Sequence, residues 1–498
     1  MVLISFLSQN TDTKAVLKDL HLQNEPRTAE ETSRIEDVVR PTLDFSKPEQ
    51  FETNQAGGAT VRPRDTSNAF SQASGNISFE RELDFKVGNG LFKKLWVSSP
   101  SSTLASDGLG PLYNARSCQR CHLKDGRGHP PEGPDDRAVS MLMRVSIPGG
   151  TGIREIADHL ASLAEPTYGE QIQDFGIAGH ASEAHLEITY EEIEIQLSGG
   201  EVASLRKPTY ALSNLGYGPT HSDMMMSPRV APQMIGLGLL DAIPAADILN
   251  LADPDDLDGN GISGRAQIVM SREYGVPILG RFGLKAGQPS VWEQSAAAFH
   301  GDIGISSTLF PSGAGECTEA QTACRAAPDG NTIVHDDAEI SDEGLDLVSF
   351  YASNLAVPAR RDVDDTQVLQ GKRVFYETGC ISCHTPKFVT HRLEDQPEQS
   401  FQLIWPYTDM LLHDMGPGLA DNRPEARADG QEWRTPPLWG IGLTKTVSGH
   451  TYFLHDGRAR SLLEAVLWHG GEAEAQKHRV TLMPPEDRAA LIRFLESL

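Results

Sequence analysis

The sequence lacks long hydrophobic runs and carries little positive charge for its length. No stretch of about 18 apolar residues is present, so we expect no transmembrane helix. Asp and Glu number 69 against 43 Lys and Arg, giving a formal net charge of −26, which argues against nucleic acid as a partner. The opening MVLISFLSQN has no basic start and makes a poor export signal. A chain of 498 residues can form two or three domains with a substantial core.

Cysteine is scarce, and four of the six cysteines fall into two copies of one pattern, SCQRCH and GCISCH. A zinc site needs further ligands at a matching spacing, and a dithiol redox pair does not need the histidine. A c-type haem uses all three side chains, two thiols for the vinyl groups and one imidazole for the iron. The sequence therefore predicts two covalently bound haem c groups, with each histidine as an axial iron ligand. The residues are Cys118, Cys121 and His122 in the first copy and Cys380, Cys383 and His384 in the second.

The two remaining cysteines, Cys317 and Cys324, bracket the short polar loop ECTEAQTAC. No other metal-ligating side chain stands beside them, which favours a local disulfide over free thiols. Haem c attachment and disulfide formation both take place outside the reducing cytoplasm. We therefore expect the protein in the periplasm, in spite of its weak export signal.

The chain contains two similar segments, each followed by one CxxCH motif. FKVGNGLFKKLW carries Gly88 three residues before Leu91, and VLQGKRVFYETGC carries Gly371 three residues before Val374. Each segment is typical of a helix in which glycine permits a close helix crossing and the following apolar pair enters the core. This repeat predicts two haem modules of the same design.

Each module also ends on a similar apolar helix. DLVSFYASNL (346–355) and ALIRFLESL (490–498) can be aligned with Val348 on Ile492 and Phe350 on Phe494. The intervening AVPARRD (356–362) contains a helix-breaking proline and is expected to be a linker.

These patterns predict a mainly α protein built of two cytochrome c-like haem domains. The predicted parts are a polar, partly ordered leader over 1–75, an N-terminal haem domain over 76–355 and a C-terminal haem domain over 363–498. The first domain would contain a large insertion, about 123–335, with some β structure. Within it, AHLEITYEEIEIQLSGGE alternates apolar and polar residues like a strand or hairpin, and APQMIGLGLLDAIPAADIL indicates a helix interrupted by Pro244.

The insertion also contains an acidic loop, DDLDGNGISGR. Asp256, Asp258 and Asn260 occupy positions 1, 3 and 5 of a calcium-type loop. Position 12 is Gln267 instead of a bidentate glutamate, so the match is partial. A Ca²⁺ site and a solvated acidic turn both remain open.

The two-module layout, RTPPLWGIGL and YFLHDGRARSLLEAVLWHGGEA resemble the bacterial di-haem cytochrome c peroxidase superfamily. SPRVAPQMIGLGLLDAIP, DGNGISGR and LLHDMGPGLAD are more similar still to the di-haem oxidoreductase family, whose members are named as peroxidases and sometimes as thiol oxidoreductases. The resemblance runs from about residue 78 to the end of the chain. It implies a haem oxidoreductase that reduces peroxide or a related oxidant.

The resemblance also implies a sixth iron ligand for the C-terminal haem. The superfamily places a Met fourteen residues after the His of an H-x-G turn; here the turn begins at His455, and His469 stands at that offset. His469 as iron ligand would give this haem a lower potential than a Met ligand would. The alternative is a histidine that caps the preceding helix.

At the N-terminal haem, the resemblance implies a Gln and a carboxylate acting on the O–O bond by acid–base chemistry. Gln233 and Asp241 are the local candidates, with Asp241 as a helix-end cap the alternative. Arg434, in the RTP element, would pair with a haem propionate. No sixth ligand is assigned to this haem.

Together these features predict a periplasmic di-haem c-type oxidoreductase, peroxidase-like, with a reactive N-terminal haem and an electron-transfer C-terminal haem. Its partners would be a small oxidant such as peroxide and an electron-donor protein, a small cytochrome or a cupredoxin. The rival hypothesis is a non-catalytic di-haem electron carrier whose two irons are both six-coordinate.

Overall fold

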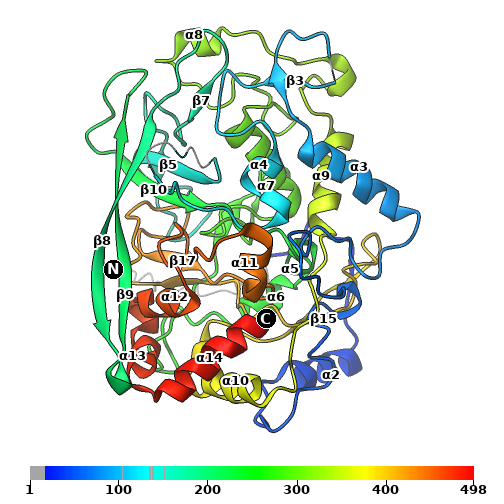
Figure 1. The fold of residues 1–498 in the computed structure, drawn as a ribbon. Helices are drawn as coiled ribbons and strands as arrows, with labels where there is room; N and C mark the ends of the chain where they lie inside the picture. The colour runs from blue at the N-terminus through cyan, green and yellow to red at the C-terminus, as the bar shows by residue number, and fades with distance from the viewer. Residues whose placement is uncertain (1–16, 104, 134–135, 137–138, 151) are drawn as a thin grey trace, which may run out of the picture.

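The computed structural model describes residues 17–103, 105–133, 136, 139–150 and 152–498 (Figure 1). It is 28% helix and 18% strand, with many small sheets, so the prediction of a mainly α fold is wrong. Most strands are only two or three residues long and pair across long loops. Such short strands have no room for a visible alternation of apolar and polar residues, which is why the sequence pattern did not reveal them.

The helices are distributed through the molecule, including its middle (Figure 1). No helix within the described ranges has both the length and the apolar character needed to cross a membrane. The α-helices are α2 (Ala29–Val39), α3 (Arg81–Lys93), α4 (Cys118–Cys121), α5 (Leu237–Asp241), α6 (Ala245–Leu249), α7 (Val291–Ala298), α8 (Thr322–Arg325), α9 (Asp342–Ser353), α10 (Thr366–Thr378), α11 (Thr444–Ser448), α12 (Leu462–Trp468), α13 (Glu474–Leu482) and α14 (Pro485–Ser497).

The longest strands form one three-stranded sheet and one hairpin, both in the predicted insertion. The sheet has the order β10-β5-β6, and β8 pairs antiparallel with β9 along their full length. The hairpin confirms the strand that was predicted from the alternation in AHLEITYEEIEIQ. It runs along one side of the molecule (Figure 1). The strands are β1 (Asn24–Glu25), β2 (Val97–Ser98), β3 (Asp107–Leu109), β4 (Leu112–Tyr113), β5 (Met141–Pro148), β6 (Ser162–Leu163), β7 (Phe175–Gly176), β8 (His185–Gln196), β9 (Val202–Ser213), β10 (Met225–Val230), β11 (Ile268–Met270), β12 (Pro277–Leu279), β13 (Phe388–Val389), β14 (Arg392–Leu393), β15 (Leu403–Ile404), β16 (Leu412–Asp414) and β17 (Glu432–Arg434).

Two helix pairs repeat the same crossing, as the glycines predicted. In the first pair α3 packs on α9, and a Cβ added at Gly88 would lie 2.1 Å from the carbonyl oxygen of Leu347 and 2.8 Å from Cβ of Tyr351. In the second, α10 packs on α14, and a Cβ at Gly371 would lie 1.9 Å from the carbonyl oxygen of Ala490. Only glycine permits either approach, because any side chain would collide with the backbone of the partner helix.

The alignment of the two closing helices was wrong by one residue. At the second crossing, a Cβ at Gly371 would lie 2.7 Å from Cβ of Phe494. At the first crossing, the residue in the same place opposite Gly88 is Tyr351. Phe494 therefore corresponds to Tyr351 and not to Phe350. With this correction, Leu347 corresponds to Ala490. In each closing helix the two contact residues are then four positions apart, which is the spacing of neighbours on one helix face.

We predict that Gly88→Ala lowers the free energy of unfolding by about 1–3 kcal/mol, because the methyl group meets the α9 backbone. Gly90→Ala on the same helix is the matched control, since its Cβ would meet nothing within 4 Å. The control should be neutral or stabilising by about 0.5–1 kcal/mol, the usual gain from Ala over Gly in a helix. Urea unfolding of both variants measures the difference, and equal stabilities would show that the crossing does not depend on Gly88.

Part of the predicted leader packs against the rest of the chain, within its described residues 17–75; residues 1–16 lie outside the described ranges. Ala56 and Phe70 are fully buried and share one hydrophobic cluster with Phe388 and Trp439 of the predicted C-terminal domain. Glu52 is also buried, among cations of the linker and of α10. The two predicted haem domains are therefore joined by a common core to which the leader contributes.

Candidate functional site

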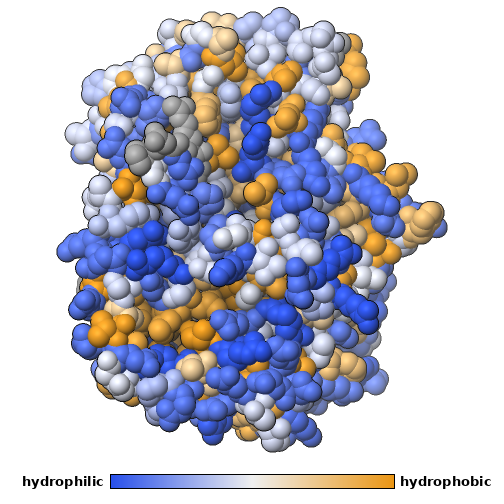
Figure 2. Space-filling view, viewed as in Figure 1, coloured by the Kyte–Doolittle hydropathy of each residue, from blue (hydrophilic) through white to orange (hydrophobic). Residues whose placement is uncertain are grey.

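Both CxxCH motifs open onto one large cavity. Its volume is about 720 Å³, and its wall includes Cys118, His122, Cys380 and His384. α12 contributes to the wall as well, and a hydrophobic hollow is visible on the molecular surface near α12 and the β8–β9 hairpin (Figure 2). The fold thus brings together two motifs that are far apart in the sequence.

The first motif lies on the short helix α4. His122 follows α4 directly, and its Nδ1 donates a hydrogen bond to the carbonyl oxygen of Pro232 at 2.8 Å. Burial lowers the pKa of His122 to about 4, so the ring is neutral at physiological pH. Because Nδ1 carries the proton, Nε2 keeps its lone pair and is free to bind a metal.

The second motif repeats this arrangement. α10 ends at Gly379, whose positive φ of 90° turns the chain into Cys380. Nδ1 of His384 donates to the carbonyl oxygen of Tyr407 at 2.9 Å, and burial lowers the pKa of His384 to about 4. His384 therefore also presents a free Nε2 at the cavity.

His469 has the same character and lies in the same wall. It follows the last residue of α12, which Ser461 caps, and its Nδ1 donates to the carbonyl oxygen of Ala465 at 2.7 Å. Burial lowers the pKa of His469, and the proximity of His469 contributes to the lowered pKa of His384. These two histidines are thus neighbours, each with a free Nε2.

His413 lines the cavity too, but its ring is fully engaged. Its Nε2 lies 2.7 Å from Asp409 Oδ2, and its Nδ1 lies 2.7 Å from Glu472 Oε2 and 3.6 Å from Cys383 Sγ. Burial alone would lower the pKa of His413. The carboxylates of Asp409 and Glu472 instead raise that pKa well above its ordinary value. A protonated imidazole has no lone pair for a metal, so His413 is a poor ligand.

The four thiols of the two motifs are poorly suited to thiolate chemistry. Burial raises the pKa of Cys118 and of Cys380 to about 12, and it raises the pKa of Cys121 and of Cys383 as well. Thiol–disulfide exchange needs an accessible thiolate. The arrangement therefore disfavours a redox-active dithiol.

Two half-buried arginines offer charge to the cavity. Arg434 donates to the carbonyl oxygens of Gly283 and Thr435, and Arg127 donates to those of Tyr452 and Leu454. Burial lowers the pKa of each to about 10, and neither has an ion pair with any carboxylate of the described residues. A half-buried cation without a counter-ion is costly, and the two carboxylates of a haem would compensate it. The wall therefore fits an anionic cofactor.

A third arginine was missed in the sequence. Arg229 lines the cavity and pairs with Glu425 at 2.7 Å, which Arg423 also contacts at 3.2 Å. Its signal was an internal repeat, because Arg229 opens RVAPQMIGLGL as Arg434 opens RTPPLWGIGL.

The structure separates the two residues that the resemblance nominated for acid–base chemistry. Gln233 lines the cavity, and its Nε2 donates to the carbonyl oxygen of Trp439 at 2.6 Å, which leaves Oε1 available. Asp241 is not among the residues that line the cavity. It contacts His21 Nε2 at 2.9 Å and accepts from the backbone N–H of Val291 at 3.3 Å, at the first residue of α7.

The acidic loop brings three carboxylates together. Oxygens of Asp253, Asp256 and Asp258 lie within 4.8 Å of one another. Asp253 lies outside the calcium-type pattern and was missed in the sequence. Asn260, which belongs to the pattern, is not in this group, and its Oδ1 accepts from the backbone N–H of Ile262. Gln267 is fully buried and donates to the carbonyl oxygens of Lys285 and Glu425.

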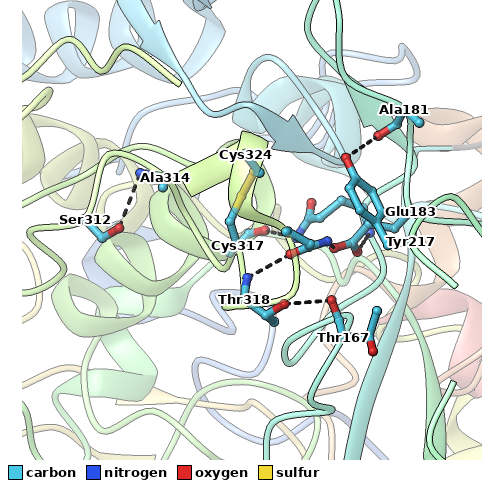
Figure 3. Close-up of a disulfide and its surroundings, with 12 residues drawn as sticks. Thr167, Ala181, Glu183, Tyr217, Ser312, Ala314, Cys317, Thr318 and Cys324 are labelled. Atoms are coloured by element: carbon cyan, nitrogen blue, oxygen red, sulfur yellow. Dashed lines mark hydrogen bonds between the residues drawn. A yellow bond between two sulfur atoms is a disulfide. The ribbon is translucent and has the colours of Figure 1, made fainter. Parts of the chain in front are cut away.

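Cys317 and Cys324 form a disulfide in the structure, with their Cα atoms 6.0 Å apart (Figure 3). The loop between them is fastened at two places. The hydroxyl of Thr318 donates to the carbonyl oxygen of Thr167 at 2.9 Å, and Nε2 of Gln321 donates to Oε1 of Glu183 at 2.5 Å.

One cavity with two CxxCH motifs, three histidines with free Nε2 atoms and half-buried arginines defines the site of a di-haem protein. The family model of "Di-haem oxidoreductase, putative peroxidase" matches residues 51–498. The chain therefore belongs to the di-haem oxidoreductase family, and the resemblance found in its motifs is confirmed.

No curated protein sequence matches the chain significantly. Among solved structures, Kuenenia stuttgartiensis hydrazine synthase pressurised with xenon is 12% identical over 92% of this chain and 100% of its own, with a TM-score of 0.29. A likeness at that score supports no conclusion about fold or function.

Proposed function

We propose that this di-haem oxidoreductase is peroxidase-like, with a reactive haem held by His122 and an electron-transfer haem held between His384 and His469. The main observation in support is that each of these histidines donates Nδ1–H to a backbone carbonyl and leaves Nε2 at one shared cavity. The second motif has two such histidines as neighbours, which suits a six-coordinate iron that transfers electrons.

The chain itself would attach, orient and neutralise the cofactors. Cys118 and Cys121 would form the thioethers of the first haem, Cys380 and Cys383 those of the second, and Arg434 would pair with a propionate. When bound, haem supplies an iron that can bind an oxidant and exchange electrons. Gln233, with its amide fixed on Trp439, would orient the oxidant at the first site.

Asp241 has no acid–base role in this proposal, because His21 and the α7 N-terminus already engage it. The carboxylates available to the first site are those of the cavity wall, which include Glu170 and Asp302. We therefore assign proton transfer in the reaction to carboxylates of the cavity wall and not to Asp241 of α5.

Two further parts of the proposal concern organisation and location. Residues 76–355 and 363–498 would each form one haem domain, supported by the two equivalent helix crossings at Gly88 and Gly371. Haem c attachment and the Cys317–Cys324 disulfide both favour the periplasm. The electron donor would be a small cytochrome or a cupredoxin.

The test combines cofactor content with turnover. Protein exported through a cytochrome c maturation pathway should show two haem additions in denatured mass spectrometry. Added peroxide should then oxidise a reduced small cytochrome or cupredoxin in the presence of the protein. Two haems without any peroxide-dependent oxidation would contradict the peroxidase proposal and favour the electron carrier.

We propose in addition that Asp253, Asp256 and Asp258 bind Ca²⁺. Binding at 100 times the dissociation constant would stabilise the fold by about 2.7 kcal/mol, so a chelator should lower the melting temperature of the wild type. Asp256→Ala with Asp258→Ala should abolish this sensitivity. Asp255→Ala, an exposed neighbour outside the group, should retain it. If the wild type itself is insensitive to chelator, the loop is an acidic turn.

A further inference from the structure

A group of charged side chains lies around Arg144 in the wall of the first site, with Arg144, Asp302 and Glu316 partly buried and Glu170 exposed. Arg144, on β5, lines the cavity together with Glu170 and Asp302. Behind it, Oε1 of Glu316 lies 4.0 Å from Nη1 of Arg144. Three charged side chains of the wall and one that contacts Arg144 from outside the wall thus come from separate segments of the chain.

Glu316 is the unusual member of this group. Its Oε2 is buried and has no hydrogen-bond partner among the described residues. Burial raises the pKa of Glu316 to about 7 against the opposing effect of Arg144, with Glu170 and Asp302 raising it further. An ordinary glutamate is fully ionised at neutral pH, whereas this one is protonated in about half of the molecules there.

The space for Glu316 exists because residue 301 is glycine. A Cβ at Gly301 would lie 3.3 Å from Oε1 of Glu316 and 4.0 Å from Nη2 of Arg144. Gly301 and Asp302 belong to a π-helical turn, Phe299–Ile303, that ends α7. π-turns of this kind occur frequently at functional sites.

Asp302 connects the group to the first CxxCH motif. Its backbone oxygen accepts from the N–H of Asn114 and of Ala115, and its Oδ1 accepts from Nε2 of Gln171 at 2.9 Å. After burial, the charge of Asp302 is the next contribution to the raised pKa of Cys118. Asp302 therefore contacts the segment just before the first motif, and its charge acts on the thiols to which the first haem would be attached.

The disulfide fixes Glu316 in this position. Glu316 directly precedes Cys317, and the disulfide ties Cys317 to α8 (Figure 3). Thr318 and Gln321 then bind the same loop to Thr167 and Glu183. The disulfide, with Cys324 fully buried, therefore holds the residue next to Glu316 in the interior.

We propose that Arg144, Glu170, Asp302 and Glu316 form a proton store for the first haem site, with the Cys317–Cys324 disulfide as its anchor. This inference rests on the proposed function. Reduction of hydrogen peroxide to two waters breaks the O–O bond and consumes two electrons, from the donor protein, and two protons. Glu316 releases its proton to the carboxylates that line the cavity, Arg144 compensates the charge left behind, and solvent returns the proton. Glu316 is thus a positioning and proton-holding residue that does not touch the oxidant.

Infrared difference spectroscopy of the di-haem protein tests the store without relying on turnover. The component of the protonated carboxylic acid stretch that belongs to Glu316 should disappear in the wild type as pH rises through about 7, beside the bands of Glu183 and Glu339, whose pKa values burial raises to about 8 and about 7. Glu316→Gln should lack this component, and Cys317→Ser with Cys324→Ser should titrate it at lower pH because the loop is released. An identical component in the Gln variant would overturn the proposal. The titratable groups around Glu316 are Arg144, Glu170, Asp302, Glu183 and His300.

Reaction with peroxide provides the second readout. Glu316→Gln should slow that reaction by about 10- to 100-fold, toward the low end of general acid–base effects, and leave carbon monoxide binding to the reduced first haem unchanged. Glu319→Gln, an exposed glutamate of the same disulfide loop, should behave as wild type. Equal rates for Glu316→Gln and wild type would contradict the store. A wild type that does not react with peroxide would instead refute the proposed function, and the infrared band would still decide whether Glu316 holds a proton.

Discussion

Replacing His469 with Ala is expected to open the C-terminal haem to external ligands. With His384 and His469 both bound, the iron would be low-spin and of low potential. The Ala variant should gain a high-spin component and bind one additional equivalent of carbon monoxide. Met in the same place should instead keep six-coordination and raise the potential, because a thioether favours the reduced iron more than imidazole does.

The control for this experiment is His478→Ala, an exposed histidine on the neighbouring helix α13 that should change neither spectrum nor potential. The other histidine near this motif, His413, already binds Asp409 and Glu472 through both ring nitrogens. If His469→Ala has the spectrum and potential of the wild type, His469 is not the ligand and the electron-entry role of this haem fails.

Cys380→Ala combined with Cys383→Ala should remove one of the two haems completely. Both thioethers of the C-terminal site are lost, and the axial ligands His384 and His469 alone would hold haem only weakly and without a covalent bond. Denatured mass spectrometry should show a single haem addition in place of two. The first helix crossing at Gly88 does not involve these residues, so the N-terminal site should keep its haem and its reaction with carbon monoxide.

The reciprocal variant, Cys118→Ala with Cys121→Ala, serves as the matched control. It should also leave one haem, but this haem should not bind carbon monoxide, since His384 and His469 would occupy both axial positions. Retention of two covalent haems in either variant would show that the altered motif is not an attachment site.

The parts of the protein that sequence revealed are those governed by local spacing. A CxxCH motif needs only five consecutive residues, and a glycine that permits a helix crossing can be seen in the sequence as a glycine within an apolar helical segment. Gly88 and Gly371 therefore located both helix pairs, although the partner helices were aligned one residue out of register. Hydrophobic spacing cannot distinguish Phe350 from Tyr351, because both lie within the apolar stripe of α9.

The fold class was wrong for a related reason. The two-residue strand β13 pairs with the equally short β15, and a pairing of this kind has no periodic signature in the sequence. Of the longer strands only β8, twelve residues long, was recognised from its alternation, while β9 and the eight-residue β5 were missed. A sequence reading that relies on periodicity therefore underestimates strand content in such an insertion.

The polar surroundings of the site depend on contacts between distant segments. His413 and Glu472 are 59 residues apart, and Arg144 and Glu316 meet only through the fold. Burial decides the charge state of these groups, and burial cannot be derived from residue spacing. For this reason Asp241 could be nominated from its position in a motif, while Asp302 and Glu316 gave no signal.

Carbon monoxide titration of the fully reduced protein tests the central claim most directly. An open first site on His122 and a closed second site between His384 and His469 predict one carbon monoxide bound for every two haems. Binding of none would mean that both irons are six-coordinate and that the protein is an electron carrier. Binding of two would contradict the assignment of His469.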